Sequence, residues 1–287
     1  MSYTIVGIGE LLWDMLPSGK QLGGAPANFA YHTNGILVSA IGNDELGKEI
    51  LTKLDSLSLN KDYIHINQNK ATSKVSVELD DEGKASYIIH EDIAWDFIPN
   101  TSKLMALAKT ADAVGFGSLA QRSTMSHNTI QAFIEATPTD TLRIFDINLR
   151  QSYYNKEIIE SSLKLANILK INDEELPIVA NMLALSGDEK TILQSLSNQY
   201  GLNLIALTKG DKGSILYTKQ QSSIHKGYPT TIEDTIGAGD SFTAALTIGL
   251  LKQHDLDTIN DHANRVAAFI CSQKGATAKL PPQLDFS

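Results

Sequence analysis

The sequence has little of what disulfide-stabilised, zinc-scaffold, membrane or nucleic-acid-binding proteins need. It contains one cysteine, Cys271, in 287 residues, which excludes a disulfide framework and a cysteine-based zinc scaffold. No apolar run approaches the roughly 20 residues that cross a bilayer. The 24 Lys and Arg against 33 Asp and Glu give a net charge of -9, so the surface has no general attraction for phosphate backbones or anionic lipid. Nucleic acid and membrane are therefore not expected as partners.

The remaining composition is that of an ordinary globular chain. Hydrophobic residues make up 42% and charged residues 20%, and a chain of this length can bury a full-sized core. Residues 1–9 form a short apolar run with no basic segment and no small-residue cleavage site, so they do not indicate a secretory signal. We predict a cytoplasmic protein with a single domain spanning residues 1–287.

Short apolar, β-rich runs alternate with helical patterns along most of the chain. The runs predicted as buried strands are 4–8, 37–41, 113–116, 142–146, 168–171 and 204–207. The segments predicted as helices are 27–33, 45–57, 123–136, 156–165, 189–200, 241–252 and 258–273. This alternation predicts a three-layer α/β/α protein with a mostly parallel, doubly wound sheet. A hairpin at 214–218 and 222–226 is expected to extend the edge of that sheet.

One stretch has a different pattern. Residues 74–79 and 84–89 alternate polar and apolar side chains across the turn from Asp80 to Gly83, as in an antiparallel hairpin with one wet face. Residues 11–22, with a turn at Pro17 to Gly19, could add strands to it. We predict a small β lid inserted from about residues 11–24 and 72–98.

The clearest functional signal is the run from Asp234 to Phe242, DTIGAGDSF. Glycines just before a helix let successive backbone N–H groups turn toward one point, where the helix dipole also favours negative charge. This is an expected anion site. Asp240 would repel the anion unless it had another task, and accepting a hydroxyl proton beside a phosphoryl group is such a task. The plainer alternative is a tight turn with Asp240 as the helix cap.

A second glycine-containing loop, GGAPANFA from Gly23 to Ala30, lies near the N-terminus. Its glycines admit a ligand close to the backbone, and Asn28 offers both a donor and an acceptor. Together with Asp14, these groups suit the vicinal hydroxyls of a sugar. Alone, the loop would more often be a plain turn with Asn28 as a helix cap.

The runs 23–30, 42–47 and 234–242 together resemble the signatures of the PfkB, or ribokinase-like, carbohydrate kinases, and the resemblance covers nearly the whole chain. It implies an α/β/α core with a small β lid and ATP-dependent phosphorylation of a sugar hydroxyl with magnesium. In some relatives potassium is also used. A homodimer formed through the lid is a further expectation by analogy.

The resemblance also assigns roles to individual residues. Asp240 would be the general base, and the amides of Gly237, Ala238 and Gly239 would form the anion hole. Expected nucleotide and metal contacts are Asn172 and Glu175 in an NxxE element, with Glu175 reaching magnesium through water, Thr208 and Gly210 beside the nucleotide, Asn264 on the adenine side, and the carbonyls of Asp234 and Ile236 around a monovalent cation.

Within the family the chain is most like bacterial fructokinases, because of the runs 9–14, 117–122 and 146–150. We therefore expect fructose as the acceptor, with a ribokinase or a 2-keto-3-deoxygluconate kinase as the alternative. The expected sugar contacts are Asp14, Gly23, Gly24, Asn28, Trp95, Gln121 and Arg150. Core packing is the alternative for Trp95, and surface ion pairs are the alternative for Arg122 and Arg150.

Two functions of other classes stay open. The run 115–120 fits GxGxxA after a strand and would suit an NAD-dependent oxidoreductase. A sugar sensor that kept the fold without catalysis is the other.

The P-loop spacing of 42–48 is rejected, because Glu49 stands where a Ser or Thr must bind magnesium. The connection at 34–36 is shorter than the family's, which we expect to shorten the preceding helix or alter its packing near Asn28.

Overall fold

A computed structural model describes residues 3–16, 19–79 and 85–285. The central parts of the two predicted turns, at Pro17 and at Asp80 to Gly83, lie outside these residues. No helix in the described ranges is long and apolar enough to cross a membrane.

Among the described residues, the larger sheet has nine strands in the order β13-β12-β11-β10-β9-β8-β1-β4-β5. The strands are β1 (Ile5–Ile8), β4 (Ile36–Gly42), β5 (Ile64–Asn67), β8 (Ala113–Phe116), β9 (Leu142–Asp146), β10 (Ile168–Asn172), β11 (Leu204–Thr208), β12 (Ser214–Tyr217) and β13 (Ser222–His225). The parallel strands are, in spatial order, β5, β4, β1, β8, β9, β10 and β11. Strands β12 and β13 form an antiparallel hairpin at the edge beside β11. The strand order reverses at β1, which lies between β4 and β8. The carboxyl ends of the parallel strands beside such a reversal are where open α/β sheets bind ligands.

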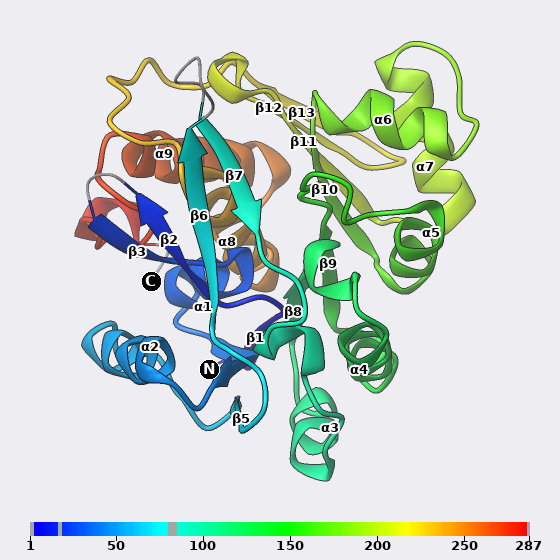
Figure 1. Cartoon of the computed structure of the whole chain (residues 1–287). Coiled ribbons are helices and arrows are strands. Elements are labelled where there is room, and N and C mark those ends of the chain that lie inside the picture. Colours follow the sequence, from blue (N-terminus) through cyan, green and yellow to red (C-terminus); the bar gives the residue numbers. More distant parts are fainter. Residues whose placement is uncertain (1–2, 17–18, 80–84, 286–287) are drawn as a thin grey trace.

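Helices cover both faces of this sheet (Figure 1). One face carries α1 (Ala25–His32), α2 (Glu45–Ser56), α8 (Ala238–Leu251) and α9 (Leu256–Cys271). The other carries α3 (Ser102–Ala108), α4 (Thr124–Glu135), α5 (Lys156–Leu165), α6 (Glu175–Met182) and α7 (Glu189–Tyr200). In β1, Val6 and Ile8 pack on the α3–α7 side and Ile5 packs on the other, as the alternation of side chains along a strand requires. The predicted three-layer fold is confirmed.

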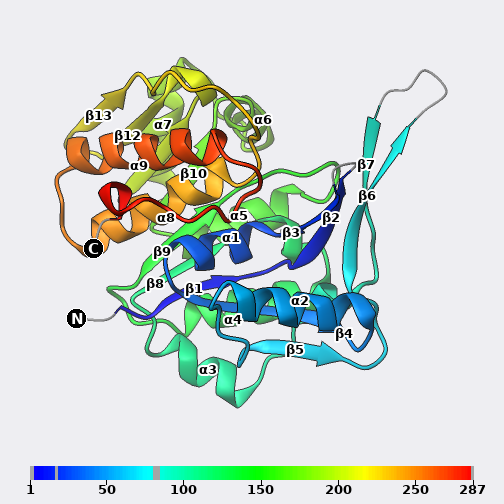
Figure 2. The same cartoon turned by 90° about the vertical axis from the view of Figure 1, so that its left-hand side faces the viewer.

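A second, smaller sheet has the order β3-β2-β6-β7 in the described residues. Its strands are β2 (Leu12–Leu16), β3 (Gly19–Gly23), β6 (Ser73–Leu79) and β7 (Ala85–Ile89). Figure 2 shows β6 and β7 projecting away from the layered core. The residues that follow differ from the expectation, because 94–97 form the 3-10 helix η1 (Ala94–Phe97), and its Ala94 and Trp95 side chains belong to the main hydrophobic core.

The short connection after α1 is closed by an unusual backbone. Helix α1 has eight residues, and Asn34 takes a positive φ of 50° before β4 begins. The next residue, Gly35, lies against the backbone of Ile5, where a side chain would come within 2.7 Å of the carbonyl oxygen. The chain therefore moves from helix to strand without additional loop residues.

Candidate active site

The conformation of the glycine-containing bend before α8 is fixed by backbone hydrogen bonds and close packing. Gly237 caps α8 with a left-handed φ of 78°, and a Cβ at this position would overlap Ala276. The Asp234 carboxylate accepts hydrogen bonds from the backbone N–H groups of Ile236 (3.0 Å) and Gly275 (3.2 Å). The bend is thus fixed against the loop that follows α9, and glycine is required at its centre.

Asp240 lies in the first turn of α8 and meets Asn28 from α1. The Asn28 Nδ2 atom donates a 2.7 Å hydrogen bond to Asp240 Oδ2, which joins two segments 212 residues apart. The other polar atom of the amide, Asn28 Oδ1, is buried without a protein partner in the described structure. The predicted base and the predicted sugar-binding amide therefore form one pair.

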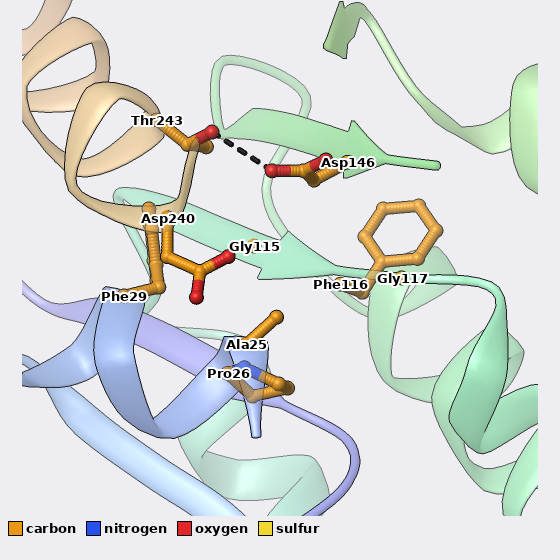
Figure 3. A pocket seen from close by; sticks show the side chains of 9 residues that line it. All are labelled: Ala25, Pro26, Phe29, Gly115, Phe116, Gly117, Asp146, Asp240 and Thr243. Carbon is orange, nitrogen blue, oxygen red and sulfur yellow. Dashed lines mark hydrogen bonds between the residues drawn. The ribbon is translucent and has the colours of Figure 1, made fainter. Parts of the chain in front are cut away.

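Asp240 faces a small pocket that is partly open to solvent, between α1 and the end of β8 (Figure 3). The lining residues are Ala25, Pro26, Phe29, Gly115, Phe116, Gly117, Asp146, Asp240 and Thr243. The pocket lies at the carboxyl ends of β8 and β9, where the strand order predicts a ligand site.

The protein environment raises the pKa of Asp240 to about 6. Removal of the carboxylate from water is the largest cause, and the negative charge of Asp146 adds to it. The hydrogen bond from Asn28 and the charges of Lys170 and Arg150 act in the opposite direction. Asp240 is therefore ionised at neutral pH, with a pKa high enough to hold a proton briefly.

Lys170, in β10, lies beside this site, and the sequence analysis did not single it out. Its Nζ lies 3.0 Å from Asp146 Oδ1, and Thr243 donates a 2.9 Å hydrogen bond to Asp146 Oδ2. A Cβ on Gly239 would lie 3.1 Å from the same Nζ. Burial alone would lower the pKa of Lys170, but the charges of Asp146, Glu175 and Asp240 raise it, so a buried cation stands beside the glycine bend. A single Lys within the apolar strand ILKIN was the available signal.

The predicted sugar contacts from the small sheet gather at the same place. Asp14 in β2 lies against Gly23 in β3, where a Cβ would overlap its carboxylate. Burial raises the pKa of Asp14 to about 6; Arg150 opposes this shift and Asp234 adds to it. Gly24, with a φ of 112°, packs on the backbone of Glu10 immediately before α1. The charge of Arg150 lowers the pKa of both Asp14 and Asp240. The hydrogen bond that the Arg150 side chain makes in the described structure is to Leu149 O, at 3.0 Å, so its contact with a sugar stays a prediction.

The NxxE element connects two strand ends. Asn172 Oδ1 accepts from the backbone N–H groups of Glu174 (3.0 Å) and Glu175 (2.7 Å). The Glu175 carboxylate accepts from Leu149 N (2.9 Å) and Asn172 N (3.0 Å), so each oxygen already holds one backbone donor. No group of three or more His, Cys, Asp or Glu side chains in the described chain could hold a metal by itself. Glu175 is 5% exposed, and its contact with magnesium through water stays a prediction.

Two predicted sugar contacts are not brought to the site. Trp95 is 0% exposed and packs in the core with the Arg122 guanidinium 4.1 Å from its ring centre, so the core-packing alternative holds. Gln121 is 2% exposed, and its amide bonds to Gly117 O, Ser162 Oγ and Gln131 Nε2. It supports the pocket loop from behind and has no exposed amide to offer a sugar. Arg122 likewise forms a buried ion pair with Asp96.

The predicted nucleotide contacts lie along the β10–β12 side of the sheet. Thr208 ends β11, and Gly210 follows with a positive φ of 56° and open space around its Cα. Asn264 is buried in α9, where its Nδ2 donates to Ser214 Oγ and Asn260 O, each at 2.7 Å. In the described structure Asn264 joins α9 to β12 and its amide donors are already used.

The GxGxxA run does not form a dinucleotide site. A Cβ on Gly115 would come within 2.9 Å of the Phe29 ring, so glycine is needed there for packing. The chain then enters the three-residue 3-10 helix η2 (Leu119–Gln121) instead of opening a long helix at the glycines. The oxidoreductase alternative therefore loses the motif on which it rested.

Comparisons with known proteins agree with this geometry. A family model described as pfkB family carbohydrate kinase matches residues 19–283. A sugar kinase from Pyrococcus horikoshii is 30% identical over 95% of this chain and 91% of that protein, and a fructokinase from Salmonella typhimurium is 26% identical over 100% and 99%.

Solved structures show the same architecture. The Pyrococcus horikoshii sugar kinase in complex with ATP has a TM-score of 0.80 at 29% identity and covers 95% of this chain and 94% of that one. A fructokinase from Xylella fastidiosa with bound ATP has a TM-score of 0.84 at 22% identity over 96% and 94%, and at that identity the likeness concerns the fold alone. The resemblance inferred from the glycine motifs is confirmed, and the chain belongs to the pfkB family of carbohydrate kinases.

Proposed function

We propose that this carbohydrate kinase transfers the γ-phosphoryl group of ATP to a hydroxyl of fructose. The observation that supports the reaction most directly is the 2.7 Å hydrogen bond between Asn28 and Asp240 beside the glycine bend and Lys170. It combines a carboxylate base, a sugar-binding amide and an anion-binding turn at one point of the structure.

Asp240 acts as the proton acceptor. Asn28 occupies Oδ2 and leaves Oδ1 for the hydroxyl of the acceptor. As the hydroxyl oxygen bonds to the γ-phosphorus, the bond from that phosphorus to the oxygen of ADP breaks and the hydroxyl proton passes to Asp240. A carboxylate with a pKa of about 6 is ionised at pH 7 and accepts this proton late, once the alcohol has become acidic.

The charge on the migrating phosphoryl group is met by backbone and side-chain donors. At the turn from Gly237 to Gly239, the N–H groups of Gly237 and Gly239 are proposed to meet the anion, and Lys170 adds a full positive charge. The Ala238 N–H donates to Thr235 O at 3.3 Å, so it has to leave this partner to join the predicted anion hole. Glu175 would hold magnesium through water, and the metal would neutralise phosphate charge there. The carbonyls of Asp234 and Ile236 are proposed as ligands of a monovalent cation that steadies the bend.

Relatives support the choice of substrates. Proteins named fructokinase are similar to this chain over almost its full length, including one from Escherichia coli at 25% identity. A fructokinase from Vibrio cholerae with the same fold binds fructose, ADP and potassium. The sugar contacts proposed for this chain are Asp14, Gly23, Gly24, Asn28 and Arg150; of these, Asn28 contacts Asp240 directly.

An ADP-release assay over a panel of acceptors tests the proposal. The panel contains fructose, ribose, 2-keto-3-deoxygluconate, tagatose 6-phosphate and adenosine, each with ATP and magnesium. Fructose is expected to give the highest kcat/KM. If another member turns over and fructose does not, the substrate is wrong and the reaction class stands. If sugars bind and none is phosphorylated, the protein is a sensor and the kinase proposal fails.

A further inference from the structure

We propose that Glu10 is a positioning residue for this reaction: its carboxyl caps α1 from the β1–β2 connection and thereby holds Asn28 against Asp240. The inference rests on the proposed function, because it assigns a role in the same site. Glu10 lies in neither glycine motif; it belongs to the run 9–14, but the sequence analysis gave it no role.

Helix α1 lacks a side-chain cap of its own. Its N-cap residue is Gly24, which has no side chain, and Pro26 in the first turn has no N–H group. Gly24 O accepts the N–H groups of Ala27 (3.0 Å) and Asn28 (3.1 Å), which leaves the Ala25 N–H as the donor that needs a partner. Glu10 Oε1 accepts it at 3.3 Å. A residue outside the helix therefore performs the task of an N-cap side chain.

The backbone on which Glu10 stands is fixed. The Gly9 N–H donates to Val38 O (3.1 Å) and Gly9 O accepts from Ser39 Oγ (2.6 Å), so the connection is tied to β4 on both sides of one residue. Gly24 packs so closely on Glu10 that a Cβ would overlap the Glu10 carbonyl oxygen. Glu10 is thus connected by hydrogen bonds and close packing to β4 on one side and to the first turn of α1 on the other.

These contacts lead along α1 to the pair formed by Asn28 and Asp240. Asn28 lies one turn beyond Ala25 on α1, and its amide reaches Asp240 at 2.7 Å. A shift of the first turn of α1 would move Asn28 and the Gly-Gly loop together while leaving the glycine bend of α8 in place. Loss of Glu10 should therefore affect sugar binding and proton transfer and spare the nucleotide side.

The state of the Glu10 carboxyl is consistent with a neutral hydrogen-bonding group. Glu10 is 3% exposed, and its second oxygen, Oε2, is buried without a partner in the described structure. Burial raises its pKa to about 7, and the negative charge of Asp240 contributes to the increase. A glutamine keeps both the shape and the acceptor for Ala25, so it should replace Glu10 far better than alanine.

The test compares Glu10→Ala, Glu10→Gln and the matched control Glu135→Gln, which alters an exposed glutamate on α4 on the other side of the sheet. Glu10→Ala is expected to lower kcat/KM for the sugar by about tenfold or more, through both a lower kcat and a higher sugar KM. The shift in melting temperature caused by ATP should remain that of the wild type. Glu10→Gln should recover most of the loss, and the control should not differ from wild type.

Amide hydrogen exchange of residues 25–32 supplies a readout that needs no turnover. Exchange there should be faster in Glu10→Ala and restored in Glu10→Gln. If the wild type phosphorylates none of the sugars, the proposed function fails, and exchange still reports on the cap. The positioning role would be overturned if Glu10→Ala kept the kcat/KM of the wild type. It would also be overturned if Glu10→Gln were as impaired as Glu10→Ala. Unchanged exchange in Glu10→Ala would overturn it as well.

Discussion

The pKa of Asp240 is set by opposing influences on one carboxylate. Burial and the charge of Asp146 favour the protonated form, while Asn28, Lys170 and Arg150 favour the ionised form. The result is a pKa of about 6, above the ordinary value of 3.8 and below neutrality. A carboxylate in this range is present as a base at pH 7 and is a stronger base than an exposed aspartate.

At the scale of this residue, kcat should fall on the acid side of neutrality. Below a pKa of about 6 the base becomes protonated, so kcat at saturating sugar should drop by about tenfold at pH 5. Asp14 has its pKa raised to a similar value, so the profile is also measured for Asp14→Asn at saturating sugar. The decline should persist in that variant. A kcat that stays level down to pH 5 would be incompatible with Asp240 as the base.

The glycine at the centre of the bend gives a second prediction at this scale. Gly237→Ala forces a side chain into Ala276 at a positive φ, so the amides should lose their aim and kcat should fall by about a hundredfold. Gly201→Ala is the matched control, because Gly201 ends α7 with a φ of 69° and open space around it. The control should lose only about 1 kcal/mol of stability and no activity. Equal kcat values for the two variants would contradict the anion-hole assignment.

At the scale of elements, Arg122 fastens the end of β7 to the core. Its guanidinium lies between the rings of Trp95 and Tyr153, 4.1 and 4.5 Å from their centres. It forms a buried ion pair with Asp96 at 2.8 Å and donates to His90 O at 2.5 Å. The Tyr153 hydroxyl donates to Ile89 O at 2.9 Å. These contacts anchor the small sheet where β7 returns to the core.

Arg122→Ala should therefore be among the most destabilising single changes outside the catalytic centre. It leaves Asp96 buried without its cation, which typically costs about 3–5 kcal/mol. Arg265→Ala is the control, since Arg265 also pairs with an aspartate and lies over a tyrosine ring but is half exposed. Its loss should cost about 1 kcal/mol or less. Urea unfolding measures both, and similar losses would refute the structural role given to Arg122.

Hydrophobic periodicity was sufficient to predict most of the elements. Segments 156–165 and 189–200 were predicted to the residue, because each combines a side-chain N-cap with a helical apolar pattern. Strand β5 was missed because it is a partly exposed edge strand, whose sequence IHIN lacks an apolar run. Helices α3 and α6 were missed because seven or eight residues give too little periodicity.

The site was predictable where backbone geometry restricts the residue type. Gly237 and Gly24, both with a positive φ, are such positions: the first lies in the run that led to Asp240 and the second in the loop that led to Asn28. Lys170 and Glu10 were missed because their roles depend on neighbours distant in sequence. Trp95 and Gln121 were assigned to the sugar from motif position alone, and the packing of η1 and η2 against α4 and α5 turns both inward.

At the scale of the whole molecule, three acids that converge on the site should make stability depend on pH. The folded-state pKa of Glu10 is about 7 against an ordinary 4.5, and those of Asp14 and Asp240 are about 6 against 3.8. An acid whose pKa is higher in the folded than in the unfolded protein stabilises the fold fully at a pH below its unfolded-state pKa. This stabilisation is lost as the pH rises through the folded-state pKa. Two histidines with lowered pKa values, the buried His32 and the half-buried His127, change stability in the opposite direction, so a difference between variants isolates the effect.

The relevant difference is between Glu10→Gln and the wild type. As the pH rises from about 4.5 to about 8, the unfolding free energy of Glu10→Gln should gain on that of the wild type by a few kcal/mol, because only the wild type must ionise a buried carboxyl. Urea unfolding over this pH range measures it, with Glu135→Gln as the control that shows no such gain. A constant difference would mean that Glu10 is not desolvated in the folded protein.

The most direct test of the account is the turnover of Asp240→Asn. Asparagine keeps the shape and the contact with Asn28 but cannot accept the hydroxyl proton, so kcat should fall by about a thousandfold or more, while ATP should still raise the melting temperature as in the wild type. Retention of most of the wild-type kcat, with nucleotide binding intact, would contradict the assignment of Asp240 as the base and with it the proposed mechanism.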